Sequence, residues 1–139
     1  MINEWGFDTT LHYKCNLFGK VFELSVKHGW DSKHFVKEVM TNKSLDWLFA
    51  YDDCQEWCDE YYFLNVLENS LTLKKGKTKD KYFMWYLGYL YKYWMTTKNV
   101  SRQYVINKLP MKKFEGSTAF NYELDWEYII RDVECGTFE

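Results

Sequence analysis

The segment from Lys81 to Thr97, KYFMWYLGYLYKYWMTT, constrains the fold more than any other part of the sequence. Almost half of its residues are aromatic, and Lys92 is the only charged residue between Lys81 and Lys98. A helix that is apolar on nearly all sides is usually buried at the centre of a domain. Gly88, in the middle of the segment, would allow a second helix to approach closely. We therefore expect a central aromatic helix inside an all-α bundle.

The aromatic segment is too short to cross a membrane. Its longest uncharged aromatic run, residues 82–91, is about half of the ~20 residues that span a bilayer. The N-terminal residues do not combine a basic start with an apolar run, so they do not resemble a secretory signal. We expect a cytoplasmic protein without membrane contact, in which the cysteines are reduced.

The rest of the chain carries further helix signals. The length of 139 residues suits one domain, residues 1–139. Hydrophobic residues make up 47% of the sequence and charged residues 27%, which is typical of a globular chain, and a single proline favours helices over many turns. Residues 111–122 show no clear pattern and are expected to be irregular. Capping residues and apolar spacing predict a single compact bundle of about six helices, at residues 9–28, 32–40, 54–71, 79–97, 101–109 and 126–133, with a short helical piece at 45–51. The candidate helix starts include Asp31 or Ser32, Ser101 and Asp125. The apolar stripe of the helix at 54–71 would consist of Trp57, Tyr61, Leu64 and Leu67.

One face of the aromatic helix is a candidate partner-binding surface. Tyrosine and tryptophan have an apolar body and a polar tip, which suits half-buried positions and interfaces. The alternative is that the same rings are ordinary core residues. A nucleic-acid stacking platform would need a basic groove beside the rings, and few cations are available here. The predicted partner-binding residues on this face are Tyr82, Trp85, Tyr89 and Tyr93.

An acidic stretch, DDCQEWCDE at residues 52–60, is the second candidate surface. Its carboxylates would attract a basic partner and speed the encounter. The alternative is structural, because acidic residues also stabilise the N-terminus of a helix through its dipole. The predicted partner-binding residues of this stretch are Asp52, Asp53, Glu56 and Asp59.

Residues 93–110 resemble a helix, a turn and a capped second helix, which is the pattern of a DNA-binding helix-turn-helix. The candidate DNA contacts are Arg102, Gln103, Lys108 and Lys112. The same pattern suits any small packed helix. A net charge of −2 and a pI near 5.9 argue against a general affinity for nucleic-acid phosphates.

No motif predicts catalysis, a cofactor or a metal site. Cys54 and Cys58 lie four residues apart, and the nearest candidate partners are His28 and His34, but this spacing matches no standard zinc site. Phosphate-binding glycine loops, serine-hydrolase elbows and zinc-protease motifs are absent from the sequence. We expect a non-enzymatic protein.

Three segments in a fixed order resemble a known group of proteins. They are HGWDSKHFVKEVM (28–40), EYYFLNVLE (60–68) and WYLGYLYKYW (85–94), followed by T-x-x-x-V-S and by a proline sixteen residues after the tryptophan. This order is similar to small bacterial helical proteins, common in Firmicutes, that have a GYLYRYW-like signature. The resemblance covers roughly residues 18–130. Lys92 stands where arginine is commoner in the group, and the residues after Pro110 depart from its pattern.

The resemblance implies a function. Proteins of this group lie in toxin–antitoxin-type operons, beside genes for ADP-ribosyltransferase-like toxins. By this resemblance the chain is an antitoxin or immunity protein that binds and neutralises a toxin encoded by a neighbouring gene. Two alternatives remain open. One is the helix-turn-helix DNA-binding regulator, and the other is a phage-encoded inhibitor of a bacterial defence protein.

Overall fold

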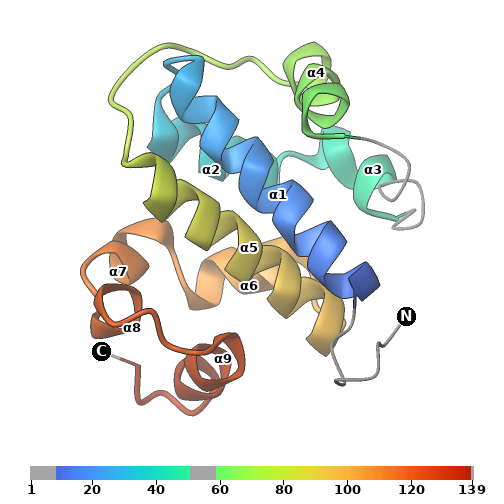
Figure 1. Ribbon diagram of the computed structural model, residues 1–139. Helices are drawn as coiled ribbons and strands as arrows, with labels where there is room; N and C mark the ends of the chain where they lie inside the picture. Colours follow the sequence, from blue (N-terminus) through green and yellow to red (C-terminus); the bar gives the residue numbers. More distant parts are fainter. Residues whose placement is uncertain (1–8, 51–58, 139) are drawn as a thin grey trace.

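Two long helices form the centre of the molecule in the computed structural model, which describes residues 9–50 and 59–138 (Figure 1). They are α1 (Thr9–Lys27) and α5 (Lys81–Lys98), and they lie side by side and antiparallel. The described residues contain no β-strand, and their one β-type pairing is an isolated antiparallel bridge between Trp30 and Lys75. The predicted all-α bundle around an aromatic helix is therefore confirmed.

Two glycines let the central helices touch. A Cβ atom on Gly88 of α5 would lie 2.9 Å from the carbonyl oxygen of Phe18, and one on Gly19 of α1 would lie 2.8 Å from Cδ1 of Trp85. Such distances are closer than any real side chain tolerates, so only glycine permits this approach. Around the contact, Phe22 of α1 and Tyr91 of α5 are fully buried. The close approach that Gly88 predicts is confirmed.

Shorter helices surround this pair. Helices α2 and α6 pack against each other, while α3 and α4 lie on one side of the central pair and α7, α8 and α9 on the other (Figure 1). A turn of 3₁₀ helix at Lys43–Leu45 precedes α3. The bounds are α2 Ser32–Thr41, α3 Asp46–Ala50, α4 Glu60–Ser70, α6 Arg102–Lys108, α7 Met111–Glu115, α8 Thr118–Asn121 and α9 Trp126–Glu134.

Side-chain caps define most of these helices. Asp31, Ser101 and Asp125 cap α2, α6 and α9 through hydrogen bonds to backbone amides, at the places where the sequence predicts helix starts. The predicted start of the helix at residues 54–71 is wrong. Asp59 is extended, with φ −91° and ψ 177°, and caps a helix that begins at Glu60.

The prediction that residues 111–122 are irregular is also wrong. Two short helices form there, after Pro110 and after Ser117, whose side chain accepts a hydrogen bond from the amide of Phe120. Met111, Phe114 and Ala119 are buried, so packing against the core stabilises turns that have little helical signal of their own.

The connection between α4 and α5, residues 71–80, is held by hydrogen bonds to the start of α2. The amide of Asp31 donates to the carbonyl oxygen of Lys74 at 2.8 Å, and the amide of Ser32 donates to that of Lys77 at 3.0 Å. The amide of Lys79 donates to Oγ of Ser32 at 2.9 Å. This connection therefore has a defined path across the N-terminus of α2. No helix within residues 9–50 and 59–138 has the length and hydropathy that a membrane span requires.

Candidate binding surfaces

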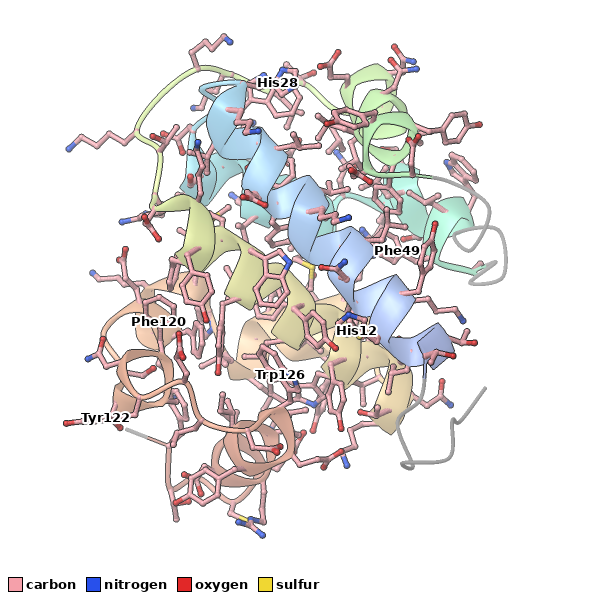
Figure 2. All side chains as sticks on the ribbon, in the orientation of Figure 1. His12, His28, Phe49, Phe120, Tyr122 and Trp126 are labelled. Atoms are coloured by element: carbon pink, nitrogen blue, oxygen red, sulfur yellow. The ribbon has the colours of Figure 1, made fainter. Side chains whose placement is uncertain are left out.

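The tyrosine face of α5 is largely covered by the chain itself. Trp126, the first residue of α9, stacks on Tyr89 with ring centroids 4.6 Å apart and contacts Tyr86 at 4.5 Å (Figure 2). In addition, Nδ1 of His12 in α1 lies 2.8 Å from the hydroxyl oxygen of Tyr89. Tyr89 is only 7% exposed, and burial raises its pKa to about 12. The prediction that Tyr89 contacts a partner does not fit this conformation.

The polar tips of the other three predicted residues also have partners within the chain. The hydroxyl of Tyr82 donates to Glu123 at 2.6 Å, and the hydroxyl of Tyr93 donates to Glu127 at 2.9 Å. The hydrogen bond to Glu123 raises the pKa of Tyr82 to about 12. Burial and the hydrogen bond to Glu127 raise the pKa of Tyr93.

Nε1 of Trp85 donates to Oδ1 of Asn16 at 3.0 Å, and the ring is half-buried. Tyr82 keeps 46% of its surface exposed, so it is the most accessible of the four predicted residues in this conformation. A partner-binding role for Tyr82, Trp85 and Tyr93 stays a prediction.

The acidic candidate surface is described only at its end. Asp52, Asp53 and Glu56 lie outside the described residues. Asp59 is exposed, and its Oδ1 accepts a hydrogen bond from the amide of Tyr62 at 2.8 Å. Its role at the N-terminus of α4 is therefore structural.

Three large aromatic side chains lie exposed on the helices that flank this stretch. Trp47 of α3 is 53% exposed, and Tyr61 and Tyr62 of α4 are 65% and 63% exposed. Oγ of Ser44 donates to the carbonyl oxygen of Ser70 at 3.2 Å, which holds the start of the α3 region beside the end of α4. We call Trp47, Tyr61 and Tyr62 the exposed aromatic set. The sequence pattern placed Tyr61 on the inward stripe of its helix, and this prediction is wrong.

Sequence reasoning missed this set because it assumed a long helix from residue 54. The helix that forms is shorter, and its inward side consists of Phe63, Leu64 and Leu67. Tyr61 is three residues before Leu64, but it lies in the first turn of α4 and its side chain is exposed there. The adjacent tyrosines in EYYFL were the available signal, because two successive residues of a helix point in different directions.

Arg102, the main candidate DNA contact, is a buried structural residue. Its guanidinium donates to the carbonyl oxygen of Val39 at 2.7 Å and to Oδ1 of Asp46 at 2.5 Å. It also lies over the ring of Phe49, 4.5 Å from the centroid. Burial lowers the pKa of Arg102, and the charge of Asp46 opposes this shift. The prediction that Arg102 contacts DNA is therefore wrong for this conformation.

The other three candidate DNA contacts are exposed but do not form one surface with Arg102. Gln103 donates to Oδ1 of Asn107 at 2.8 Å, and Nζ of Lys108 lies over the ring of Tyr104 at 5.6 Å. Lys112 belongs to α7 and lines a separate pocket. A recognition helix would need its side chains directed into one groove.

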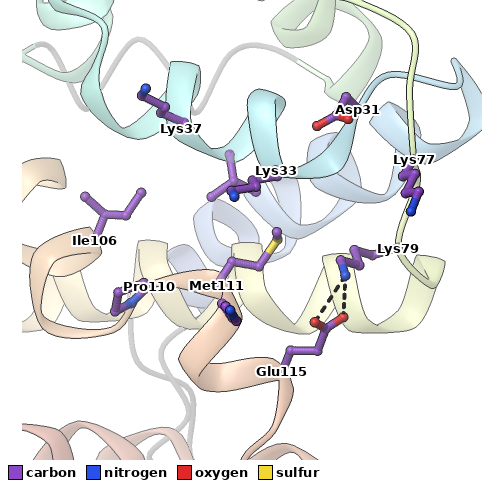
Figure 3. Close-up of a pocket in the computed structure, with 11 residues that line it drawn as sticks. Asp31, Lys33, Lys37, Lys77, Lys79, Ile106, Pro110, Met111 and Glu115 are labelled. Carbon is purple, nitrogen blue, oxygen red and sulfur yellow. Dashed lines mark hydrogen bonds and ion pairs between the residues drawn. The ribbon is translucent and has the colours of Figure 1, made fainter.

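That pocket has a volume of about 500 Å³ and opens between α2, the 71–80 connection and the region where α6 meets α7 (Figure 3). We call it the lysine-lined pocket. Two carboxylates lie at its edge, those of Asp31 and Glu115, and Nζ of Lys79 pairs with Glu115 at 2.9 Å. Its apolar lining consists of Val36, Ile106, Pro110 and Met111. Its lysines are Lys33, Lys37, Lys77, Lys79 and Lys112.

Of these lysines, the sequence analysis singled out Lys112 alone. Lys33 and Lys37 are four residues apart, which places them on one face of α2. The basic connection KKGKTKDK was visible as a charged loop. However, no local pattern indicated that this loop crosses the start of α2. This crossing brings Lys77 and Lys79 to the same pocket as the lysines of α2.

Comparisons of the chain with protein-family models, curated proteins and solved structures found no match. Within the described part of the chain, no group of three or more histidine, cysteine, aspartate or glutamate side chains is placed to hold a metal ion. Cys15 is buried and Cys135 is exposed. The Cys54 and Cys58 pair lies outside the described residues.

Proposed function

We propose that the chain is a non-enzymatic protein-binding module, and that its partner is the toxin which the resemblance to antitoxin-type proteins implies. The observation that supports this proposal is the exposed aromatic set. Trp47, Tyr61 and Tyr62 each present more than half of their surface to solvent, on two neighbouring helices. Large aromatic side chains that are exposed together commonly mark a binding surface.

The chemistry of this surface suits a protein partner. Tryptophan and tyrosine are the residue types that most often dominate the binding energy of protein interfaces, because each buries a large rigid area and keeps a polar tip. Asp59 is exposed beside the set. Asp52, Asp53 and Glu56 lie in the sequence between Trp47 and Tyr61. The partner should therefore offer an apolar groove with a basic rim.

The test is a growth-rescue experiment with a matched control. The chain is co-expressed with the product of its neighbouring gene, and both growth and co-purification are measured. The triple variant Trp47→Ser, Tyr61→Ser, Tyr62→Ser should abolish rescue and weaken the complex at least tenfold. The control is Tyr122→Ser, which removes a ring that is 76% exposed but lies at the end of α8, on the other side of the molecule from α3 and α4 (Figures 1 and 2).

Circular dichroism should give the same helical signal for the triple variant and the wild type, because the removed rings are exposed. If the neighbouring product is not toxic, the antitoxin role is wrong. If it is toxic and the triple variant still rescues growth like the wild type, the exposed aromatic set is not the binding surface. Equal loss in Tyr122→Ser would also contradict the assignment of the surface.

A further inference from the structure

We propose that the lysine-lined pocket binds a small organic phosphate, that is, a molecule with phosphate groups attached to a carbon-rich or ring-containing body. This inference does not depend on the exposed aromatic set or on the toxin partner. It rests on three properties of the pocket: excess positive charge, an apolar lining of suitable size, and a wall that hydrogen bonds already hold in place.

The pocket carries more positive charge than its own carboxylates neutralise. Five lysines and two carboxylates line it, which is a net charge of +3 on a chain with a net charge of −2. Glu115 pairs with Lys79. Among the described residues, no carboxylate lies within ion-pair distance of the ammonium groups of Lys33, Lys37 or Lys112. Like charges that converge on one concave site concentrate anions there.

Asp31 is ionised and is already counted in this net charge, but its carboxylate is held by the backbone of α2 and, within the described residues, lies within ion-pair distance of none of the pocket lysines. Oδ1 of Asp31 accepts a hydrogen bond from the amide of His34 at 2.9 Å, which caps α2. That bond, together with one from the backbone of Lys77 and the charge of Lys74, lowers the pKa of Asp31. Lysine ammonium groups act as point charges for phosphate and need no fixed planar geometry, so the remaining lysines suit a phosphate group.

The apolar lining selects a ligand that is more than an inorganic anion. Val36, Ile106, Pro110 and Met111 form it, and a bare phosphate would leave these side chains uncovered. The pocket volume of about 500 Å³ lies in the range that holds small organic ligands. The organic body of the ligand would cover the apolar lining while its phosphates meet the lysines at the rim (Figure 3).

The same lining argues against a nucleic-acid chain. None of the residues that line the pocket is aromatic, so bases would find no rings on which to stack. Asp31 and Glu115 at the edge would repel a phosphate backbone that continued past the pocket. A compact ligand does not continue past the pocket, and its organic body can pack on the aliphatic side chains without any stacking.

The wall that carries Lys77 and Lys79 is held in place by the chain's own hydrogen bonds. The backbone pairing of residues 74–79 with Asp31 and Ser32 holds it beside α2. Gly76 is required there, because a Cβ atom at this position would lie 2.4 Å from Oδ2 of Asp31. A site that is already ordered loses little conformational entropy when a ligand binds.

The test uses ATP in magnesium-free buffer as the probe, with isothermal titration calorimetry as the readout. We expect ATP to bind, and the double variant Lys33→Gln, Lys37→Gln to weaken binding at least tenfold. The control is Lys20→Gln, Lys27→Gln, which removes two exposed lysines of α1 that do not line the pocket and should leave the affinity unchanged. Lys112→Glu, on a different helix, should weaken binding at least as much as the double variant.

Two further measurements show which parts of ATP are recognised and where it binds. Adenosine and tripolyphosphate should each bind at least tenfold more weakly than ATP, because each lacks one half of the recognised chemistry. In methyl NMR spectra, ATP should shift the signals of Ile106 and Met111 in the pocket and leave that of Met95, which lines a different pocket, in place.

Three outcomes would overturn the proposal. Equal affinities of the lysine variants and the control would show that ATP binds elsewhere. Equal affinities of tripolyphosphate and ATP would show that the apolar lining takes no organic body. Failure of ATP to bind at millimolar concentration, with binding of an acidic peptide instead, would assign the pocket to a protein segment. Thermal unfolding of each variant shows whether a loss of binding is instead a loss of the fold.

Discussion

Two of the contacts that α5 makes differ in kind, the one with α1 and the one with α9 and the residues just before it. The contact with α1 is close, because Gly19 and Gly88 bring the two backbones together among fully buried side chains. The contact with α9 combines a ring stack on Trp126 with tyrosine hydroxyls that donate to carboxylates at the surface. The α1 contact is therefore mainly apolar packing, and the α9 contact is partly electrostatic.

The difference explains why a tyrosine-rich helix face need not be a partner-binding face. A tyrosine can bury its ring against a neighbouring ring and direct its hydroxyl to a carboxylate at the edge of the same contact. Tyr82 and Tyr93 do this with Glu123 and Glu127, and Lys98 also pairs with Glu127 at 2.9 Å. Packing responds weakly to pH and salt, whereas these bonds respond to both.

Gly88→Leu should have the largest effect, because it blocks the α1 contact. The added side chain would meet the carbonyl oxygen of Phe18 and the ring of Phe22, neither of which can move without disturbing the core. We expect a loss of about 3 kcal/mol or more in the free energy of unfolding, measured by urea denaturation. Gly116→Leu is the matched control, since a Cβ there meets nothing within 4 Å, and it should change stability by about 0.5 kcal/mol at most. Equal effects in the two variants would refute the close approach of α1 and α5.

Trp126→Ala should have the next largest effect, because it removes the ring that covers Tyr89 and Tyr86. Trp126 is half-buried, so we expect a loss of about 2 kcal/mol, less than for a fully buried ring. Hydrogen exchange should accelerate at the amides of α9 far more than at those of α1. Tyr128→Ala, which removes a more exposed ring of the same helix, serves as the control. A uniform loss of protection across α1 and α9 would mean that the two contacts unfold as one unit.

Alkaline pH should weaken the protein through the tyrosine hydroxyls. The pKa of Tyr82 is raised to about 12, first by the hydrogen bond to Glu123, and burial raises that of Tyr89 to about 12. Because the folded pKa lies above the unfolded value near 10, the stabilisation is complete below pH 10 and is lost as the pH rises towards 12. Urea denaturation between pH 8 and pH 12 measures this decline.

The double variant Tyr82→Phe, Tyr93→Phe sharpens the measurement. It should be less stable than the wild type at pH 8 and should show a shallower decline above pH 10, because two of the titrating hydroxyls are gone. Tyr122→Phe, at a tyrosine that is 76% exposed, is the control and should leave the decline unchanged. An identical decline in the double variant and the wild type would show that these two hydroxyls do not contribute.

Glu127→Gln should have the smallest effect. The hydrogen bond from Lys98 is the main reason that the pKa of Glu127 is lowered, and both side chains of this pair are exposed by more than a third. We expect a loss below about 1 kcal/mol, which decreases further in high salt. Since the folded pKa is lowered, the difference between variant and wild type should be present above pH 4.5 and vanish as the pH falls below it.

The control for this prediction is Glu23→Gln in α1, where no ion pair involves the carboxylate within the described residues. A loss in Glu127→Gln that is independent of salt and pH would show that the side chain acts through packing. The α9 contact would then resemble the α1 contact more closely than its hydrogen bonds suggest.

Much of the fold could be predicted from the sequence because its signals are local. The aromatic run with Gly88 predicts the central helix, and Asp31, Ser101 and Asp125 predict three helix starts that the structure confirms. The errors occurred where local signals are weak. Residues 111–122 form helices because their apolar side chains pack on the core, and α4 begins at Glu60 because Asp59 is extended and caps it.

The candidate surfaces could be predicted less well, because a residue pattern does not say what covers a helix face. In the sequence, Arg102 resembles an exposed residue of a recognition helix. In the structure, its guanidinium donates to the carbonyl oxygen of Val39, 63 residues away in the chain. Tyr89 likewise resembles an interface residue in the sequence, but in the structure Trp126 stacks on its ring and His12 contacts its hydroxyl. In both cases the partner lies on another helix, so no spacing within one helix could reveal it.

The sequence by itself determined the all-α class, the central aromatic helix and most of the helix starts, because periodicity and capping act between residues a few positions apart. Only the tertiary structure decided which rings are covered, that Arg102 is structural, and that Lys33, Lys37, Lys77 and Lys112 share one pocket. The physical reason is that charge and exposure depend on how helices turn and cross. That arrangement is set by the whole core, centred on the contact between Gly19 and Gly88.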